Sequence, residues 1–313
     1  MAAIKLISKT REEWLENRKG GIGASEVATV LGINPWETPY QLWRRKVGLD
    51  AGKDENMAMR LGHLLEDAVA KLWAEETDNE VIASTAGDWM YVDKDKSFLR
   101  VSPDRLYWIK GQKKNAKNKG ILEIKTTQKT IDEDNIPQHW FVQVQMNLGV
   151  SGFKHATIAW LTQGRSFGYK EIEFDPKFYA YLVSEVENFW VNNVLANVAP
   201  PAVSADDVML KFPIPDASKV NEVAEQIALD CDEYKQVKAK IAELDARKDE
   251  LEESIKSQFA DGEAISYGGL TLATWKMGKA TMKFDAKAFV AEHPEVAAQY
   301  MREQAGSRRF TVK

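Results

Sequence analysis

The hydrophobic period of the sequence changes near residue 79, and this change constrains the fold most. Between residues 57 and 76, apolar side chains recur three and four positions apart, as on one face of a helix: Leu61, Leu64, Leu65, Ala68, Val69 and Leu72. From residue 80, short β-branched and aromatic runs predict strands over 80–85, 89–92, 98–101, 105–109, 120–125 and 155–161. Helical spacing also predicts helices over 11–18, 25–31, 39–47, 140–148 and 175–194. Strands enclosed by helices predict an α/β domain over residues 1–215.

Two further segments follow this domain. Residues 198–215 contain four prolines and are predicted to form a connecting arm. Segment 216–260 contains neither Gly nor Pro, and its apolar spacing predicts a long amphipathic helix or a helical pair, although Lys238 and Lys248 interrupt the stripe. Residues 261–313 predict a small α+β extension, with strands over 263–267 and 270–275 around the hairpin dipeptide Gly268-Gly269 and a helix over 286–292.

The charge balance limits the kind of surface that the chain presents. There are 42 Lys and Arg residues against 47 Asp and Glu residues, a net charge of −5, which excludes a broadly basic coat of the kind that DNA binding often needs. Segment 216–260 is acidic and the rest of the chain is nearly neutral. We therefore expect any basic surface to be a narrow track with Arg18 and the cluster Arg44, Arg45 and Lys46, to which the basic loop 113–119 adds candidate phosphate contacts.

The sequence shows no membrane-spanning or secretory segment and contains one cysteine. No run of about 18 apolar residues predicts a transmembrane helix, and residues 1–14 lack the apolar region of a secretory signal. No membrane partner is expected. Cys231 is the single cysteine, which excludes an internal disulfide and a cysteine-ligated iron–sulfur cluster. The expected location is the reducing cytoplasm.

The pattern that carries chemistry lies on two consecutive predicted strands. Asp104 follows Pro103, and Glu123 and Lys125 share one face of the next strand because side chains alternate in direction. Neighbouring strands lie about 4.8 Å apart, so Asp104 and Glu123 can meet. Two such carboxylates repel unless a cation neutralises them, and Mg²⁺ suits a few carboxylates with water and phosphate oxygens. Lys125 would then orient or deprotonate a water molecule, and as a base it needs a lowered pKa.

An acidic residue two positions before a lysine is by itself a common pattern, and Asp285-Ala286-Lys287 is a second case in this chain. The surroundings distinguish the first case. A predicted helix before it carries Glu66, in GHLLED, and a predicted helix after it carries Gln143, in FVQVQMNLG.

Together these motifs resemble a known family. The run SPD, a variable loop and then LEIK resemble the PD-(D/E)xK nuclease core, and GIGASEVATVLG, GHLLED and QVQM resemble the YqaJ-type viral recombinase nucleases, relatives of lambda exonuclease. The resemblance implies a mixed central sheet flanked by helices. It also implies a Mg²⁺-dependent 5′→3′ exonuclease that degrades linear double-stranded DNA to mononucleotides, with Mn²⁺ expected to substitute for Mg²⁺.

The resemblance implies partners as well. The remaining 3′ single strand would pass to a phage single-strand annealing protein, and several relatives encircle DNA as a trimeric ring, so a homotrimer is expected. A phage or prophage would encode the protein, which would act in the cytoplasm of the bacterial host.

Residue roles follow from the same resemblance. Glu66, Asp104, Glu123 and Lys125 match the catalytic set, and Gln143 matches a glutamine that holds the site or the substrate. The metal ligands would be Asp104, Glu123, Glu66 and the backbone carbonyl of Ile124. The alternative for Gln143 is a polar residue at the edge of the core.

A second set of residues matches a pocket for the DNA 5′ phosphate. Arg18 and Ser25 would bind this phosphate, and the alternative is that Ser25 is a helix N-cap and Arg18 a surface residue. Among the tryptophans, Trp36 is the best candidate for DNA contact, whereas Trp73 and Trp160 are expected in the core. His63 lies one turn before Glu66 and would reach the site.

Two other functions remain open from sequence. One is an endonuclease built on the same core, although the single cysteine excludes a nuclease with an iron–sulfur cluster. The other is an inactive protein that binds DNA ends or acts as a scaffold, which the intact set of Asp104, Glu123 and Lys125 disfavours.

Overall fold

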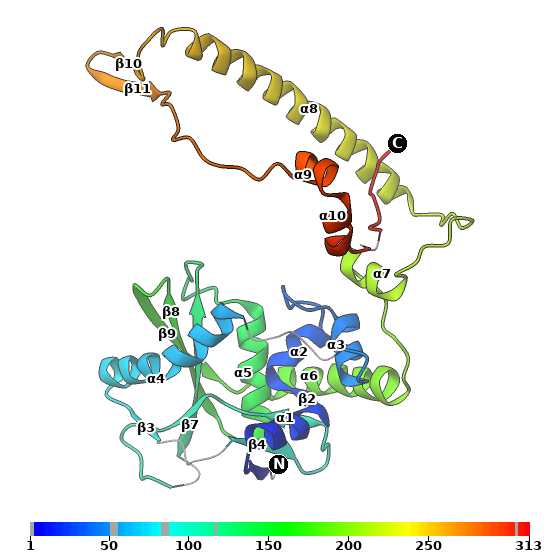
Figure 1. The fold of residues 1–313 in the computed structure, drawn as a ribbon. Helices are drawn as coiled ribbons and strands as arrows, with labels where there is room; N and C mark the ends of the chain where they lie inside the picture. Colours follow the sequence, from blue (N-terminus) through cyan, green and yellow to red (C-terminus); the bar gives the residue numbers. More distant parts are fainter. Residues whose placement is uncertain (1–2, 51–55, 83–87, 116–117, 304–305) are drawn as a thin grey trace. The chain divides into compact units, whose positions relative to one another are not determined.

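The chain divides into two compact units, Met1–Pro215 and Asp216–Lys313. The computed structural model describes residues 3–50, 56–82, 88–115, 118–303 and 306–313. Part of the predicted strand 80–85 and part of the basic loop 113–119 lie outside these residues. The helices and strands are drawn in Figure 1.

The first unit combines helices and strands. Its helices are α1 (Arg11–Lys19), α2 (Ala24–Val30), α3 (Pro39–Lys46), α4 (Met57–Thr77), α5 (Gln138–Ser151), α6 (Pro176–Phe189), the π-helix η1 (Trp190–Leu195) and α7 (Ala205–Lys211). Its strands are β1 (Ala3–Ser8), β2 (Ile22–Gly23), β3 (Glu80–Ile82), β4 (Asp88–Asp93), β5 (Leu99–Val101), β6 (Arg105–Trp108), β7 (Lys119–Thr127), β8 (His155–Thr162) and β9 (Ser166–Glu173).

A five-stranded mixed sheet with the order β3-β6-β7-β8-β9 lies at the centre of this unit. Strands β7 and β8 are parallel, because α5 connects them, and the other neighbours are antiparallel. This confirms the predicted mixed α/β architecture. Strand β6, which begins directly after Asp104, lies beside the strand that carries Glu123. The β6–β7 pairing ends at Arg105 opposite Leu122, whereas the β7–β8 pairing continues to Thr127.

Helices cover both faces of this sheet, as Figure 1 shows for α4 and α5. On one face, Val69 and Trp73 of α4 pack with Leu122 of β7. On the other face, Val144 of α5 packs with Ile158 of β8. Since both faces are covered, β7 is buried along most of its length, including the face that carries Glu123.

A second sheet has the order β1-β4-β5-β2. The predicted strands 89–92 and 98–101 therefore belong to a different sheet from the catalytic candidates. The sequence patterns missed β1, β2 and β9, which are short or alternate weakly. The α2 helix packs with this sheet around Ile22, Val27 and Leu99, and Val142 and Met146 of α5 join the same core.

The apolar stripe predicted on α4 is wrong in its first half. Leu61 and Leu64 are 48% and 68% exposed, and Ala68 is exposed as well. The buried contacts with the sheet come from the second half of the helix, through Val69 and Trp73. The helical period was correct, but the apolar side chains Leu61 and Leu64 of the first half stay exposed.

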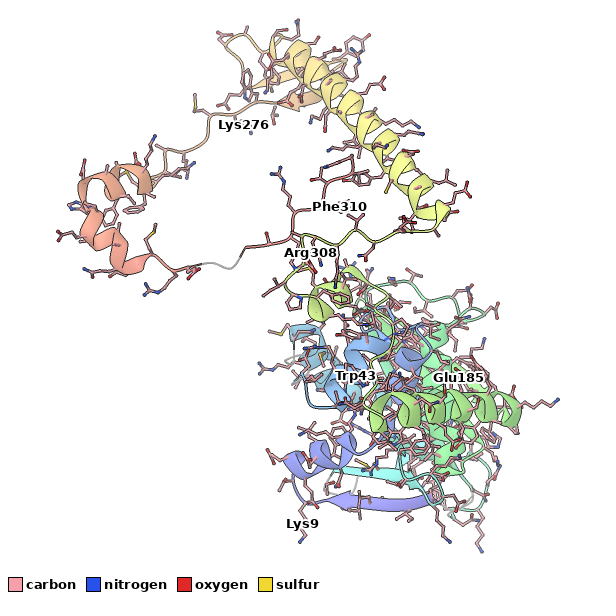
Figure 2. The ribbon with its side chains drawn as sticks, turned by 90° about the vertical axis from the view of Figure 1, so that its right-hand side faces the viewer. Lys9, Trp43, Glu185, Lys276, Arg308 and Phe310 are labelled. Atoms are coloured by element: carbon pink, nitrogen blue, oxygen red, sulfur yellow. The ribbon has the colours of Figure 1, made fainter. Side chains whose placement is uncertain are left out.

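The predicted arm 198–215 contains a short helix, α7. Ser204 caps this helix by accepting a hydrogen bond from the backbone N–H of Asp207. The buried carboxylate of Asp207 also accepts a hydrogen bond from the Thr38 hydroxyl (2.8 Å). Nearby, Trp43 (Figure 2) donates its indole N–H to the carbonyl of Asn193 (3.0 Å), which joins α3 to η1.

The second unit consists of α8 (Glu225–Lys256), the hairpin strands β10 (Ala264–Tyr267) and β11 (Leu270–Thr274), α9 (Ala286–Glu292) and α10 (Pro294–Tyr300). The predicted helix 216–260 begins nine residues later than expected. Gly268 and Gly269 have φ angles of 59° and 81°, as the predicted tight hairpin turn requires. Within the described ranges, no helix has the length and apolarity needed to cross a membrane.

Candidate active site

The catalytic candidates meet where β7 extends beyond β6. The backbone of β7 has no strand partner on the β6 side after Leu122 in the described pairing, so its N–H groups there need another acceptor. The carboxylate of Asp104 accepts the N–H of Ile124 with a distance of 2.7 Å from nitrogen to Oδ2. This hydrogen bond fixes Asp104 beside the strand that carries Glu123 and Lys125.

Glu123 is buried at the centre of a hydrogen-bond network. Its Oε1 accepts from the Lys125 ammonium (2.6 Å) and from the Gln143 amide (2.5 Å), and Lys125 also donates to the Gln143 side-chain carbonyl (3.0 Å). The Asn147 amide donates to the other oxygen, Oε2 (3.0 Å). The structure therefore brings Asp104, Glu123, Lys125 and Gln143 together.

Asn147 was missed from the sequence. It lies four residues after Gln143 on α5, so both amides point from the same face of the helix toward β7. The signal was a pair of amide residues four positions apart on this helix. The buried Oδ1 of Asn147 has no hydrogen-bond partner among the described residues.

The carboxylates perturb one another. Burial, together with the charge of Asp104, raises the pKa of Glu123 to about 7, although the neighbouring Lys125 ammonium opposes this shift. Burial and Asp104 likewise raise the pKa of Glu66. A group of carboxylates that resist ionisation together has the electrostatic character of a cation site.

The pKa of Lys125 is shifted upward, whereas a general base requires a lowered pKa. Its burial favours a lower pKa, but Glu123 and Asp104 outweigh burial and raise the pKa of the ammonium. The Lys125 side chain is 19% exposed, so its proton can still reach a ligand at the surface. With the carboxylates as neighbours, Lys125 is a cation and a hydrogen-bond donor.

Glu66 reaches the same site from α4. The guanidinium of Arg105 bridges Glu66 (3.3 Å) and Asp67 (2.6 Å), and it also donates to the backbone carbonyl of Asp104 (2.6 Å). The charge of His63 lowers the pKa of Glu66, which places the imidazole near this carboxylate. Arg105 was missed from the sequence, where it read as an ordinary strand residue.

The donor atoms fit a hard divalent cation. Asp104, Glu66 and Glu123 offer only oxygen ligands, and their mutual repulsion would be relieved by a dication. In the part of the chain that the structure describes, no group of three or more Asp, Glu, His or Cys side chains lies close enough together to hold a metal ion. Mg²⁺ does not need one, since it usually takes one or two carboxylates and keeps water and phosphate oxygens.

Arg18 and Ser25, the predicted phosphate-binding pair, are in contact. The half-buried Arg18 guanidinium donates to the exposed hydroxyl of Ser25 (3.0 Å). Gly23 is the N-cap of α2, so the alternative role of Ser25 as the cap is wrong. The pair lies where α1 and the start of α2 meet.

The basic cluster beside this pair serves a buried carboxylate, which corrects the predicted basic track. Glu26 is 4% exposed and pairs with Lys46 (2.7 Å) and Arg45 (2.7 Å), and Arg45 also pairs with Glu37 (2.9 Å). The Lys46 side chain is only 2% exposed and donates to the carbonyl of Gly21 (2.6 Å). Lys46 is therefore inaccessible to a DNA phosphate.

Replacing Glu26 with Gln is expected to destabilise the first unit by about 3 kcal/mol, because Lys46 would keep a buried charge without its partner. Burial raises the pKa of Glu26, but Lys46 and Arg18 outweigh it and lower this pKa to about 2. A lowered folded-state pKa stabilises the fold above the unfolded value near 4.5, and this stabilisation is lost as the pH falls toward 2.

Urea unfolding of the wild type and of Glu26→Gln at several pH values checks this. The difference in free energy of unfolding should be constant near pH 7 and shrink below pH 4.5. Glu37→Gln is the matched control and should cost about 1 kcal/mol, because Glu37 is 20% exposed. A Glu26→Gln difference that does not depend on pH would contradict the assignment.

The tryptophans divide into exposed and buried ones as predicted. Trp36 is 67% exposed and its ring contacts His139 edge-to-face, with centroids 5.2 Å apart. Trp73 and Trp160 are buried. The role of Trp36 as a DNA contact stays a prediction.

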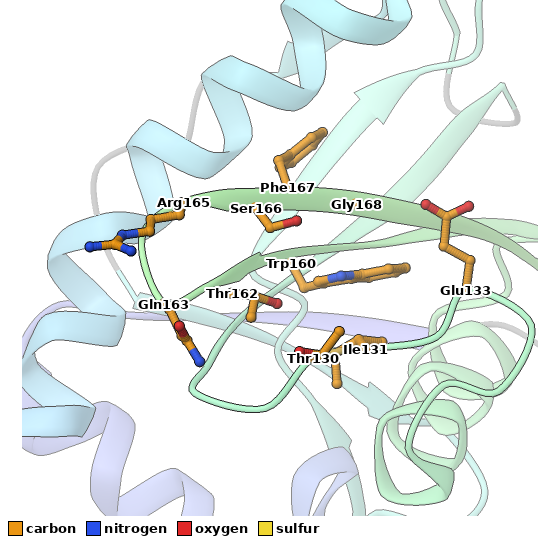
Figure 3. Close-up of a pocket in the computed structure, with 10 residues that line it drawn as sticks. All are labelled: Thr130, Ile131, Glu133, Trp160, Thr162, Gln163, Arg165, Ser166, Phe167 and Gly168. Carbon is orange, nitrogen blue, oxygen red and sulfur yellow. The ribbon is translucent and has the colours of Figure 1, made fainter. Parts of the chain in front are cut away.

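A cavity of about 280 Å³ adjoins the β8–β9 hairpin (Figure 3). Trp160 and Thr130 line it, together with Glu133, Arg165 and Phe167. Trp160 pairs in register with Lys125, so the cavity lies one strand away from the catalytic strand. None of the predicted site residues lines it.

Comparisons with known proteins identify the family. Residues 13–154 match the YqaJ-like viral recombinase domain. The chain is 31% identical to the uncharacterized protein YqaJ of Bacillus subtilis (strain 168), over 97% of this chain and 94% of that protein.

Two exonucleases are among the solved proteins that this chain resembles, at low sequence identity. An alkaline exonuclease, LHK-Exo from Laribacter hongkongensis, is 19% identical with a TM-score of 0.46, over 60% of this chain and 94% of that one. Its complex with dAMP has a TM-score of 0.47 and 19% identity, over 64% and 98%. A phage-related exonuclease from Haemophilus somnus 129PT is 10% identical with a TM-score of 0.41, over 57% and 96%. On the match to the domain and to the Bacillus protein, which confirms the resemblance of the sequence motifs, the chain belongs to the YqaJ family of viral recombinase domains.

Proposed function

We propose that the protein is a Mg²⁺-dependent 5′→3′ exonuclease that degrades one strand of linear double-stranded DNA, with a PD-(D/E)xK core as its catalytic domain. The observation that carries this proposal is the buried network of Glu123, Lys125 and Gln143 beside Asp104. A purely structural ion pair between Glu123 and Lys125 would not need two further carboxylates, Asp104 and Glu66, that raise the pKa of Glu123. Membership of the YqaJ family supports the same function.

Asp104, Glu123, Glu66 and the carbonyl of Ile124 would hold the cation. When bound, Mg²⁺ supplies Lewis-acid polarisation of the scissile phosphate and lowers the pKa of a coordinated water, and Mn²⁺ should replace it. The neighbouring carboxylates raise the pKa of Lys125, so its ammonium would donate a hydrogen bond to the attacking water or to a phosphate oxygen. Of the two roles predicted for Lys125, this favours orienting the water over deprotonating it.

The helix α5 would position these groups. Gln143 holds both Glu123 and Lys125, so it fixes the distance between the carboxylate and the ammonium. Asn147 holds the second oxygen of Glu123 from the next turn. Rigid placement of this kind lowers the reorganisation that charge development in the transition state would otherwise require.

Arg18 and Ser25 would bind the 5′ phosphate of the DNA end, and the exposed Trp36 would contact a base near it. We further propose that the 3′ single strand is passed to a phage annealing protein, that the nuclease units form a trimeric ring, and that the protein acts in the host cytoplasm. These proposals rest on the family.

Replacing Arg18 with Ala should lower the degradation rate on 5′-phosphorylated duplex ends by about 10- to 100-fold, because charge-assisted hydrogen bonds to the phosphate are lost. The rate on 5′-hydroxyl ends should change little. Nucleotide release from the two substrates gives the ratio of the rate on 5′-phosphorylated ends to the rate on 5′-hydroxyl ends. Lys19→Ala is the matched control, because Lys19 is the next residue but is 70% exposed and pairs with Glu16. An Arg18→Ala variant that still discriminates between the two ends would contradict the phosphate role.

The competing function is an endonuclease with the same site. Closed circular duplex DNA has no end, so the proposed exonuclease should leave it intact in Mg²⁺ while it degrades the linearised form. Cutting of the circle at a comparable rate would favour the endonuclease. Binding of the linear form, but not of the circle, without any metal-dependent product would favour the inactive end-binding protein.

A further inference from the structure

The long helix α8 presents an apolar stripe that its own unit leaves open. In the described part of the chain no residue of α8 is buried, and Ile241, Leu244 and Leu251 are 55%, 69% and 46% exposed. The ring of Phe310, labelled in Figure 2, contacts Tyr234 with centroids 5.8 Å apart, and this contact lies near one end of the stripe. An exposed stripe of this length indicates a partner.

The stripe follows a heptad repeat over 29 residues. Position a is held by Ile227, Tyr234, Ile241, Lys248 and Ile255, and position d by Asp230, Val237, Leu244 and Leu251. Lys238, which interrupts the stripe when it is read as a broad helical face, lies outside these positions. A repeat sustained over four heptads is typical of a coiled coil.

The flanking charges identify the partner. Position g carries Glu233, Lys240 and Arg247, and position e carries Lys238, Asp245 and Glu252. In a parallel, in-register pair of helices, each g residue faces the e residue five positions later on the other chain. Glu233 then faces Lys238, Lys240 faces Asp245 and Arg247 faces Glu252, so all three contacts are attractive, and the symmetry of the pair repeats them on its other side.

Antiparallel pairing has weaker complementarity, because g residues face g residues along one flank and e residues face e residues along the other. With the helix centres aligned, the repulsive contacts between Lys240 and Arg247 on the g flank offset the attractive contacts between Lys238 and Asp245 on the e flank. If one helix is shifted by one heptad, Lys240 faces Lys240 of the second copy. If it is shifted by one heptad the other way, Arg247 faces Arg247 of the second copy. Like charges placed opposite each other disfavour these arrangements.

We propose that α8 pairs with α8 of a second copy of this chain as a parallel, in-register, two-stranded coiled coil over residues 227–255. β-branched Ile at a with Leu or Val at d favours two strands. Two core positions are charged, Lys248 at a and Asp230 at d, and such residues fix the register at a cost in stability. On its own helix Lys248 pairs with Asp245 (3.1 Å), which partly compensates its charge. The pairing does not depend on the proposed nuclease activity. Three helices of one proposed trimeric ring cannot all pair two by two, so the pairing would join α8 helices of different rings.

Disulfide trapping in the full-length chain tests the orientation. Cys231 is replaced with Ser, Leu251 with Cys, and the protein is oxidised. Parallel register places residue 251 of both chains face to face, so a covalent dimer should form to near completion. The control, Glu253→Cys in the same background, lies on the outer face and should not cross-link. Failure of Leu251→Cys to cross-link, or efficient cross-linking between a Leu251→Cys chain and a Tyr234→Cys chain, would overturn the parallel register.

Charge reversal tests the partner. One variant of the Leu251→Cys chain carries Lys238→Glu, Asp245→Lys and Glu252→Lys, and a second carries Glu233→Lys, Lys240→Glu and Arg247→Glu. Each alone places like charges at all three contacts, so the rate of covalent dimer formation should fall at least about tenfold. Mixing the two variants restores opposite charges and should restore the rate.

Equal rates in the Leu251→Cys chain, the two charge-reversed variants and their mixture would overturn the proposal. The fraction of chains that become cross-linked shows the number of strands. Two strands allow every chain to be cross-linked, whereas three strands leave one chain in three unpaired and stop the reaction at about two thirds, which would overturn the two-stranded assignment.

Discussion

Replacing Lys125 with Ala should lower the rate of nucleotide release by about 10³-fold, because the site loses the donor that faces the reacting phosphate and the cation that balances Glu123. Lys125 is the only residue that contacts both Glu123 and Gln143 in the described network. Release of acid-soluble nucleotides from a linear duplex in Mg²⁺ measures the effect. A duplex-binding assay and circular dichroism separate this loss from a failure to fold.

The chain contains its own control for this variant. Lys287 also follows an acidic residue at a spacing of two, but Asp285 caps α9 instead of joining a carboxylate cluster. Lys287→Ala should therefore keep the wild-type rate. If Lys125→Ala degraded DNA at the wild-type rate, or if both lysine variants lost activity equally, the catalytic assignment of Lys125 would be wrong.

Replacing Asp104 with Asn should lower the rate at saturating Mg²⁺ by about 10²- to 10³-fold and shift the Mg²⁺ concentration for half-maximal rate upward. The amide oxygen of Asn can still accept the N–H of Ile124, so the local backbone is preserved, whereas the negative charge that attracts the cation is removed. The same substitution should lower the pKa of Glu123, because Asp104 is the neighbouring charge that raises it.

Rates across a Mg²⁺ titration, with EDTA as the metal-free reference, check this prediction. EDTA should abolish nucleotide release by the wild type. Asp95→Asn is a suitable control, since Asp95 is an exposed acidic residue in the turn after β4, outside the carboxylate cluster. An Asp104→Asn variant with an unchanged Mg²⁺ requirement would exclude Asp104 as a ligand.

The sequence predicted the catalytic strands well, because their signal is local. The alternation of β7 places Glu123 and Lys125 on one face, and the short polar loop before it makes β6 its antiparallel neighbour. Gln143 was reached through the resemblance to the family. Asn147 was not reached, because a buried amide on a helix is recognised only when its partner across the helix–sheet interface is known.

Contacts between residues far apart in the sequence could not be predicted. Lys46 read as a surface residue of a basic cluster, but Glu26 lies 20 residues earlier and becomes its buried partner only when α2 and α3 pack together. The division of the strands into two sheets has the same cause, since 89–92 and 105–109 have similar local patterns. The first half of α4 kept its helical period but not its predicted burial, because a period shows which side chains share a face and not what covers that face.

Strand-specific labelling tests the central claim most directly. A linear duplex carries a label on the 5′-terminal nucleotide of one strand in one sample and on its 3′-terminal nucleotide in another, and both are digested in Mg²⁺. The proposed function predicts that the 5′ label is released first, as a mononucleotide, while the 3′ label stays on long products until digestion is nearly complete. Early release of the 3′ label, or simultaneous appearance of internal fragments, would contradict a 5′→3′ exonuclease.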